Sequence, residues 1–110
     1  MLKKKYRLPI QEVFQKRGVS IKTPYFLLKI FENNLPFNRF GVIISKKASP
    51  IAARRNNLKR IFFNQAQGFI SLGKIKKDFL FILSPKISLF KRDEAAKLFQ
   101  ETFKKFISNV

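Results

Sequence analysis

The chain has 110 residues, which is enough for one domain with a single hydrophobic core, and we predict one domain over residues 1–110. Its 24 lysines and arginines against 6 acidic residues give a formal net charge of +18, a density that attracts polyanions. The absence of cysteine and histidine excludes a disulfide framework, a thiolate nucleophile, a cysteine zinc site and the commonest general base.

The start of the chain predicts a basic arm and then a short helix. Residues 1–9 are rich in lysine, and Pro9 breaks any helix that begins earlier. Residues 10–17 have apolar side chains at helical spacing, and Gly18 is a natural cap for the C-terminal end of that helix. The apolar side of the helix consists of Ile10, Val13 and Phe14.

Two β-strands are expected next, joined as a hairpin. Residues 20–31 predict one long strand, in which Pro24 is tolerable only at an edge or a bulge. Residues 32–38 have the composition of a turn, and residues 39–45 predict the returning strand. Alternation places Phe26, Leu28 and Ile30 on one face, and Tyr25, Leu27, Lys29 and Phe31 on the other. A lysine among apolar residues is hard to bury without a partner, so we expect Lys29 to face phosphate or solvent.

A basic helix over residues 49–67 is the most informative stretch. Ser49 predicts its N-cap and Pro50 its first position. Its apolar side is expected to consist of Ile51, Leu58, Ile61, Phe62, Gln65, Ala66 and Phe69, and its other side of Asn56, Lys59, Arg60, Phe63 and Gln67. Its cations, Arg54, Arg55, Lys59 and Arg60, have no acidic residue within a helical turn. Solvated faces usually mix charges, because like charges one turn apart repel. We therefore interpret this face as a polyanion-binding surface; the alternative is an ordinary solvated face.

The C-terminal part predicts a loop, a strand and a last helix. Residues 68–77 form the loop, and the apolar run in residues 78–84 predicts a strand covered on both faces and stopped by Pro85. The helix over residues 91–107 is expected to bury Ala95, Leu98, Phe99, Phe103 and Phe106. The order α-β-β-α-β-α predicts a small α/β domain, an α+β sandwich with helices packed on a sheet.

The acidic residues are too few and too scattered for a self-contained catalytic site. Metal-assisted phosphodiester cleavage needs several carboxylates that converge on one or two cations. Only Asp93 and Glu94 are adjacent, and the dipole of the last helix explains their position. We therefore expect no catalytic residue and no metal site in this chain. No apolar stretch has the length of a signal peptide or a membrane span, so we expect a cytoplasmic protein with no membrane partner.

Residues 41–60 carry two motifs, one at the end of a strand and one in the basic helix. They are Gly41-Val42-Ile43-Ile44-Ser45-Lys46-Lys47 and Arg55-Asn56-Asn57-Leu58-Lys59-Arg60. Together with Arg7-Leu8, Val13-Phe14 and the strand from Asp78 to Pro85, they resemble the protein component of bacterial ribonuclease P. The chain departs from that pattern at Asn57 and Phe63, where arginine is common, at Lys29, where tyrosine is common, and at Ile10, where phenylalanine is common.

The resemblance implies a fold, two partners and a set of contacts. The implied fold is similar to the second domain of ribosomal protein S5, with a left-handed βαβ crossover where the general rule favours a right-handed one. The implied partners are a ribonuclease P RNA, which binds most of the Mg²⁺ and performs the endonucleolytic cleavage, and precursor tRNA, which loses its 5′ leader. The expected RNA-binding residues are Lys46, Lys47, Arg54, Arg55, Asn56, Lys59 and Arg60. The expected leader-binding residues are Phe14, Tyr25, Lys29 and Phe63.

Other interpretations stay open at this point. Phe14 and Phe31 can equally be core residues, because large apolar side chains are usually buried. A structural ribosomal or other RNA-packaging protein is the alternative function, since it shares the charge and the fold type. A helix-turn-helix DNA-binding protein fits poorly, because no second helix with a short turn precedes the basic helix.

Overall fold

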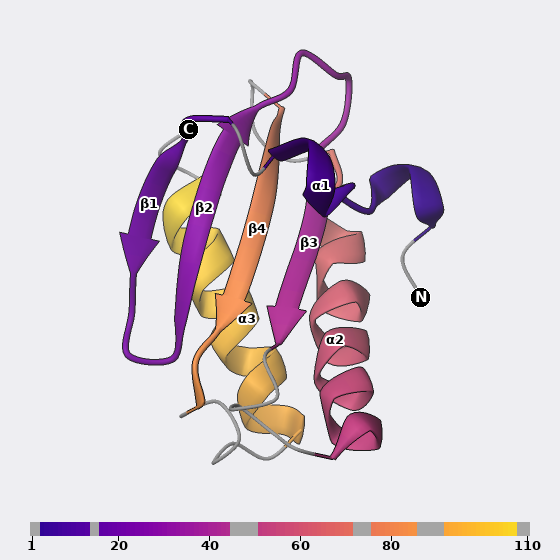
Figure 1. Cartoon of the computed structure of the whole chain (residues 1–110), viewed down its shortest axis with the longest axis vertical. Coiled ribbons are helices and arrows are strands. Elements are labelled where there is room, and N and C mark those ends of the chain that lie inside the picture. Colours follow the sequence, from indigo (N-terminus) through magenta and orange to yellow (C-terminus); the bar gives the residue numbers. More distant parts are fainter. Residues whose placement is uncertain (1–2, 14–15, 45–50, 72–75, 86–91, 108–110) are drawn as a thin grey trace.

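A single β-sheet backed by two long helices organises the chain (Figure 1). The computed structural model describes residues 3–13, 16–44, 51–71, 76–85 and 92–107. The elements are η1 (Lys4–Tyr6), α1 (Ile10–Val13), β1 (Val19–Lys22), β2 (Phe26–Glu32), β3 (Arg39–Ile44), α2 (Ala52–Ala66), η2 (Gln67–Phe69), β4 (Lys77–Leu83) and α3 (Arg92–Ile107). The expected α+β fold class is confirmed.

The last strand of the chain lies inside the sheet. The strand order is β1-β2-β4-β3, with β2 antiparallel to β1 and β4, and β3 parallel to β4. The expected hairpin between β2 and β3 is therefore wrong, because β4 lies between them. In Figure 1, β3 and β4 both point down, β4 lies to the left of β3, and α2 lies behind the sheet. The β3-α2-β4 crossover is thus left-handed, as the resemblance implied.

The predicted strand over residues 20–31 is two strands joined by a tight turn. The Thr23 hydroxyl donates a hydrogen bond to the Phe26 carbonyl at 3.0 Å and accepts one from the Phe26 N–H at 3.1 Å. Pro24 lies within this turn, where its missing N–H removes no ladder bond. The element order is therefore α-β-β-β-α-β-α, with one strand more than the sequence predicted.

The main core lies between the sheet and the two helices, and phenylalanine dominates it. Phe103 of α3 is fully buried at its centre. Its ring centroid lies 4.6 Å from that of Phe69, 4.7 Å from Phe79, 5.3 Å from Phe40 and 5.6 Å from Phe99. The rings of Phe40, Phe69 and Phe79 are tilted or edge-on to that of Phe103, and the Phe99 ring is parallel to it. Such arrangements are common between aromatic rings, so one helix side chain ties α3 to β3, β4 and η2.

The boundaries of α2 differ from the predicted ones at the N-terminal end. The helix begins at Ala52, and the predicted cap at Ser49 and Pro50 lies outside the described residues. Ile51 occupies the N-cap position with extended backbone and is 60% exposed, so its predicted burial is wrong. The predicted burial of Leu58, Ile61, Phe62 and Ala66 is confirmed.

The predicted apolar side of α3 agrees with the structure where its side chains are described. Ala95, Phe99 and Phe103 are buried and Leu98 is half-buried. The side chain of Phe106 lies outside the described part.

The basic arm is fixed against the edge of β3. The Leu8 N–H donates to the Phe40 carbonyl at 2.8 Å, and Arg7 forms a parallel bridge with Phe40. A Cβ atom on Gly41 would lie 3.1 Å from the Leu8 Cβ, so the glycine permits this close approach. The arm therefore adds a short extra backbone segment beside β3.

A buried ion pair joins β3 to β4. The Arg39 guanidinium donates two hydrogen bonds to the fully buried Asp78 carboxylate, at 2.8 and 2.7 Å, and the Asn33 amide donates a third at 2.9 Å. The hydrogen bond to Asp78 raises the pKa of Arg39, and this effect exceeds the opposing effect of burial. Asp78 is thus a structural carboxylate.

Candidate RNA-binding surface

Helix α2 buries one side and presents cations and amides on the other. Leu58, Ile61, Phe62 and Ala66 anchor it on the core, which fixes its rotation about its own axis. Among the predicted RNA-binding residues, Arg54, Asn56 and Arg60 are exposed, Arg55 and Lys59 are half-buried, and Lys46 and Lys47 lie outside the described residues. No acidic residue occurs within α2. One described carboxylate, that of Asp93 of α3, lines a hollow together with Arg60 and Asn57.

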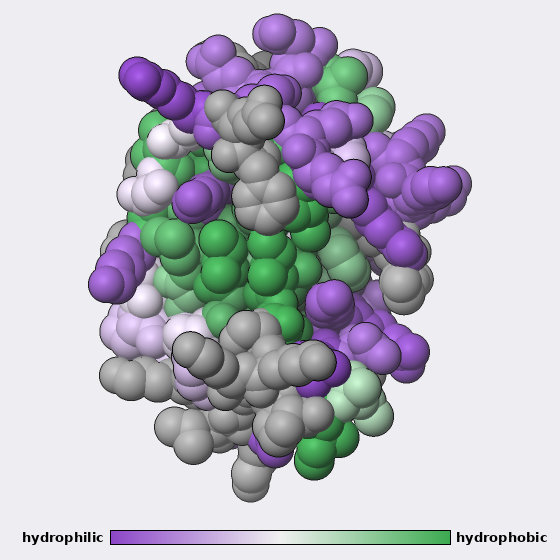
Figure 2. All heavy atoms as spheres, in the orientation of Figure 1, coloured by the Kyte–Doolittle hydropathy of each residue, from purple (hydrophilic) through white to green (hydrophobic). Residues whose placement is uncertain are grey.

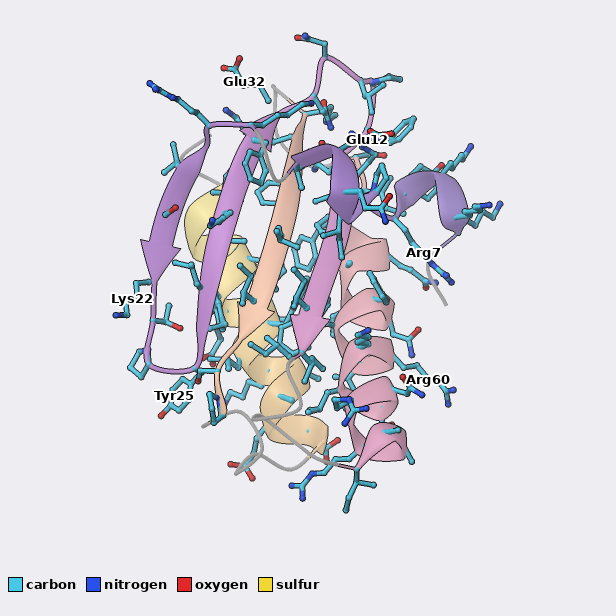
Figure 3. The ribbon with its side chains drawn as sticks, in the orientation of Figure 1. Arg7, Glu12, Lys22, Tyr25, Glu32 and Arg60 are labelled. Atoms are coloured by element: carbon cyan, nitrogen blue, oxygen red, sulfur yellow. The ribbon has the colours of Figure 1, made fainter. Side chains whose placement is uncertain are left out.

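A cleft of about 440 Å³ lies between α2, the edge of β3 and the basic arm. We call it the arm cleft; its lining residues are Arg7, Leu8, Ile10, Gly41, Val42, Asn56, Lys59, Arg60 and Phe63. The Arg7 guanidinium lies over the Phe63 ring, 5.7 Å from its centroid. Figure 3 shows Arg7 and Arg60 on the same side of the molecule, beside α2. The arm cleft is thus lined by both polar and apolar side chains.

The face of the sheet opposite the helices carries an apolar surface, and Lys29 lies beside it. The register places Leu27, Ile82 and Ile43 in one cross-strand row. Figure 2 shows the apolar patch at the centre of this face, with hydrophilic side chains on either side of it. Lys29 lies between Ser20 of β1 and Leu80 of β4 in the next row and is half-buried. The positively charged Lys29 therefore lies at the edge of the apolar surface formed by Leu27, Ile82 and Ile43.

The four predicted leader-binding residues do not lie together. Lys29 is on the open face of the sheet. Tyr25 packs against the main core, contrary to its predicted position beside Lys29, because the turn at Thr23 interrupts the alternation. Phe63 lies in the arm cleft on α2. Phe14 lies outside the described residues.

Phe31, for which burial in the core was one of the alternatives, is a core residue. It is 4% exposed and packs with Leu8, Val13 and Leu80 in a second, smaller cluster on the open side of the sheet. A Cβ on Gly18 would lie 2.7 Å from a Phe31 ring carbon, so glycine is needed there for close packing. The arm and α1 thus cover one end of the open face.

The basic arm is a part of the site that the sequence motifs did not indicate. Arg7, Leu8 and Ile10 line the arm cleft, although they are far in sequence from α2. Hydrophobic periodicity carries no information on which strand a short arm will pair with. The lysines and the arginine of the arm were the only available signal.

The described residues hold no group of three or more acidic, histidine or cysteine side chains that could bind a metal ion. The helices in the described part are too short or too polar to cross a membrane. Among the described carboxylates, Asp78 is engaged by Arg39 and Glu101 lies 3.9 Å from Lys97. The chemistry that this surface supplies is cationic and hydrogen-bonding.

Two relatives match part of the chain in sequence. A stretch of 64 residues is 39% identical to a ribonuclease P protein component from a Pseudanabaena species, covering 54% of this chain and 55% of the relative. A stretch of 61 residues is 34% identical to a protein of the same name from Thermotoga petrophila, covering 53% of this chain and 51% of the relative. In both cases the match spans about half of the relative's length.

The fold and the family are found over nearly the whole chain. The structure is similar to that of the RNase P protein from Staphylococcus aureus, with a TM-score of 0.79 over 93% of this chain and 96% of the other, at 21% identity. At that identity the similarity shows a shared fold. The model of the Ribonuclease P family matches residues 2–107. The chain therefore belongs to the Ribonuclease P family.

Proposed function

We propose that the chain is the protein subunit of a ribonuclease P ribonucleoprotein in the cytoplasm. It binds the catalytic RNA through α2 and the 5′ leader of precursor tRNA on the open face of the sheet. The RNA partner holds Mg²⁺ and hydrolyses the phosphodiester bond, which removes the leader. The observation that carries this proposal is the cationic side of α2, held at the rim of the arm cleft in a chain of the Ribonuclease P family.

The chemistry of α2 suits an RNA backbone. Guanidinium and ammonium groups bind phosphate oxygens, and such contacts fix the position of a nucleic acid without reading its sequence. Asn56 adds an amide that can donate to a phosphate, or donate to and accept from a base edge. Because each phosphate contact releases counterions, binding through this helix weakens as salt is added.

The first test is a cleavage assay at low Mg²⁺ with a bacterial ribonuclease P RNA and precursor tRNA. Adding the chain is expected to increase cleavage, and the double variant Lys59→Ala with Arg60→Ala is expected to bind the RNA more weakly. The slope of log affinity against log salt should be shallower by about 0.7–0.9 for each lost phosphate contact. The matched control is Lys97→Ala with Lys104→Ala, which removes two charges from exposed positions on α3.

Two outcomes would count against the proposed role of the chain in assisting the RNA. One is cleavage that does not change when the wild-type chain is added. The other is an equal loss of RNA affinity in the α2 and α3 double variants, which would show that only the total charge matters. Mg²⁺-dependent cleavage by the nuclease-free chain alone would contradict the assignment of catalysis to the RNA.

The leader assignment has its own test at Lys29. Lys29→Met keeps an unbranched apolar stem beside Leu80 and removes the charge, so the sheet should be preserved. We expect weaker binding of precursor tRNA to the assembled ribonucleoprotein and nearly unchanged binding of mature tRNA, which has no leader. Filter binding of both RNAs measures the difference, with Lys97→Met as the control. Equal losses for the two RNAs would refute leader binding at this position.

A further inference from the structure

The arm cleft combines three kinds of contact within one hollow. Its floor is apolar, formed by Leu8, Val42 and the backbone at Gly41. Lys59 and Arg60 supply cations from consecutive positions of α2, and Asn56 supplies an amide one turn earlier. Phe63 presents an aromatic ring one turn after Lys59. Apolar lining with a few convergent polar groups is the usual composition of a small-molecule site.

We propose that the arm cleft binds one unpaired nucleotide of an RNA, with its base stacked on Phe63 and its phosphate held by Lys59 and Arg60. This inference rests on the proposed function for the identity of the natural RNA. Phosphate contacts alone would explain the cations of α2. The inference adds a site that binds a base.

The base is placed by the Phe63 ring. Phe63 is half-buried and packs on the core, so its ring is held in position before any ligand enters. Base–aromatic stacking is a general mode of single-strand recognition. Arg7 approaches the ring at 5.7 Å, the outer range of a cation–π contact, and its planar guanidinium is itself a stacking surface. An entering base therefore meets an aromatic ring and a guanidinium at the same place.

The size of the cleft suits a single unpaired nucleotide. A volume of about 440 Å³ lies within the range of roughly 300–1,000 Å³ that is typical of small-ligand sites. A base in a duplex has both faces stacked and its pairing edge occupied, so it cannot place a face on Phe63. Extruding a base from a helix costs free energy, and a base that is already unpaired avoids most of that cost.

Asn56 gives the site a preference among bases. A side-chain amide can form two hydrogen bonds with adenine, one to the exocyclic amine and one to a ring nitrogen. Asn56 lies one turn from Lys59 and Arg60 on the same side of α2, so phosphate and base edge can be held by neighbouring residues. We therefore expect adenine to be preferred over uracil.

The chain provides a direct spectroscopic test because it contains no tryptophan. Phe63→Trp introduces a single indole into the cleft. Titration with a hexamer of adenylate is expected to quench its fluorescence, and a hexamer of abasic nucleotides with the same number of phosphates is expected to quench it little. A hexamer of uridylate should bind more weakly than the adenylate hexamer.

A second variant measures the contribution of the ring to affinity. Phe63→Leu keeps an apolar side chain against the core and is expected to weaken adenylate-hexamer binding about five- to tenfold, while binding of the abasic hexamer stays nearly constant. Phe37→Leu is the matched control, since Phe37 is also half-buried and does not line the cleft. Asn56→Ala should reduce the preference for adenylate over uridylate.

The outcomes separate this inference from the proposed function. Equal quenching by the adenylate and abasic hexamers, or equal losses in Phe63→Leu and Phe37→Leu, would overturn the base site and leave the cleavage assay untouched. Base-dependent quenching together with no effect of the chain on precursor tRNA cleavage would support the base site and overturn the ribonuclease P assignment.

Discussion

Replacing Phe103 with alanine is expected to lower the free energy of unfolding by about 3–5 kcal/mol. Phe103 is fully buried, and its ring contacts those of Phe40, Phe69, Phe79 and Phe99. Truncation removes the transfer free energy of the ring and leaves a cavity, because four large rings in four different elements cannot all move inward. Small domains have about 5–15 kcal/mol of stability, so the variant should be close to unfolding at 37 °C.

Urea denaturation followed by circular dichroism measures this loss. Lys104→Ala, next along α3 and exposed, is the control and should stay within about 0.5 kcal/mol of the wild type. Phe103→Leu should lose clearly less unfolding free energy than Phe103→Ala, since the leucine side chain fills part of the cavity. A loss below about 1 kcal/mol for the alanine variant would show that the aromatic core can collapse around the deletion.

Asp78→Ala is expected to destabilise the chain by about 3–5 kcal/mol, because it leaves the Arg39 guanidinium buried without its carboxylate. The side chain of Arg39 is 16% exposed and that of Asp78 is fully buried, so water cannot replace the lost partner fully. The pKa of Arg39 is raised, so its contribution is complete at neutral pH and is lost only as the pH rises through that higher value. A guanidinium is not deprotonated near neutral pH even without a partner, so Arg39 stays charged in the variant at pH 7.

A double variant distinguishes the ion pair from simple loss of packing. Arg39→Met with Asp78→Leu removes both charges and keeps apolar volume, and it should recover most of the stability that Asp78→Ala loses. Thermal unfolding of the three proteins gives the comparison. The double variant could instead be as unstable as Asp78→Ala. That result would show that the loss of stability comes from the Asn33 contact or the local shape and not from the unpaired charge.

Local patterns predicted the helices better than the strand arrangement. The apolar spacing of α3 predicted the burial of Ala95, Phe99 and Phe103, and the residues 78–84 predicted β4 to within one residue at each end. Which strands pair depends on contacts between distant parts of the chain, so the insertion of β4 between β2 and β3 carried no local signal. Thr23 and Pro24 did carry a turn signal, which the apolar run around them obscured.

The same distinction holds for the candidate site: local features were predictable from the sequence, and features that depend on distant contacts were not. The side of α2 that faces outward followed from helical periodicity alone, and the exposure of Asn56 and Arg60 agrees with it. The arm cleft could not be predicted, because it exists only where Arg7 and Leu8 meet β3 and α2. Asn38 was likewise expected in a turn, yet it is buried, donating to the Phe69 carbonyl and accepting from the Lys77 N–H. Such residues are fixed by partners that are remote in sequence.

The place of β4 in the sheet has a consequence for the order in which the chain folds during translation. The hairpin of β1 and β2 can form as soon as it leaves the ribosome, but β3 and α2 have no central strand to join until β4 has been made. At about 5–20 residues per second this interval lasts seconds, and during it the apolar side of α2 lacks its partners. The nascent chain therefore carries a strongly basic segment with an uncovered hydrophobic side through the polyanionic surroundings of the ribosome, and only the synthesis of β4 and α3 ends that exposure.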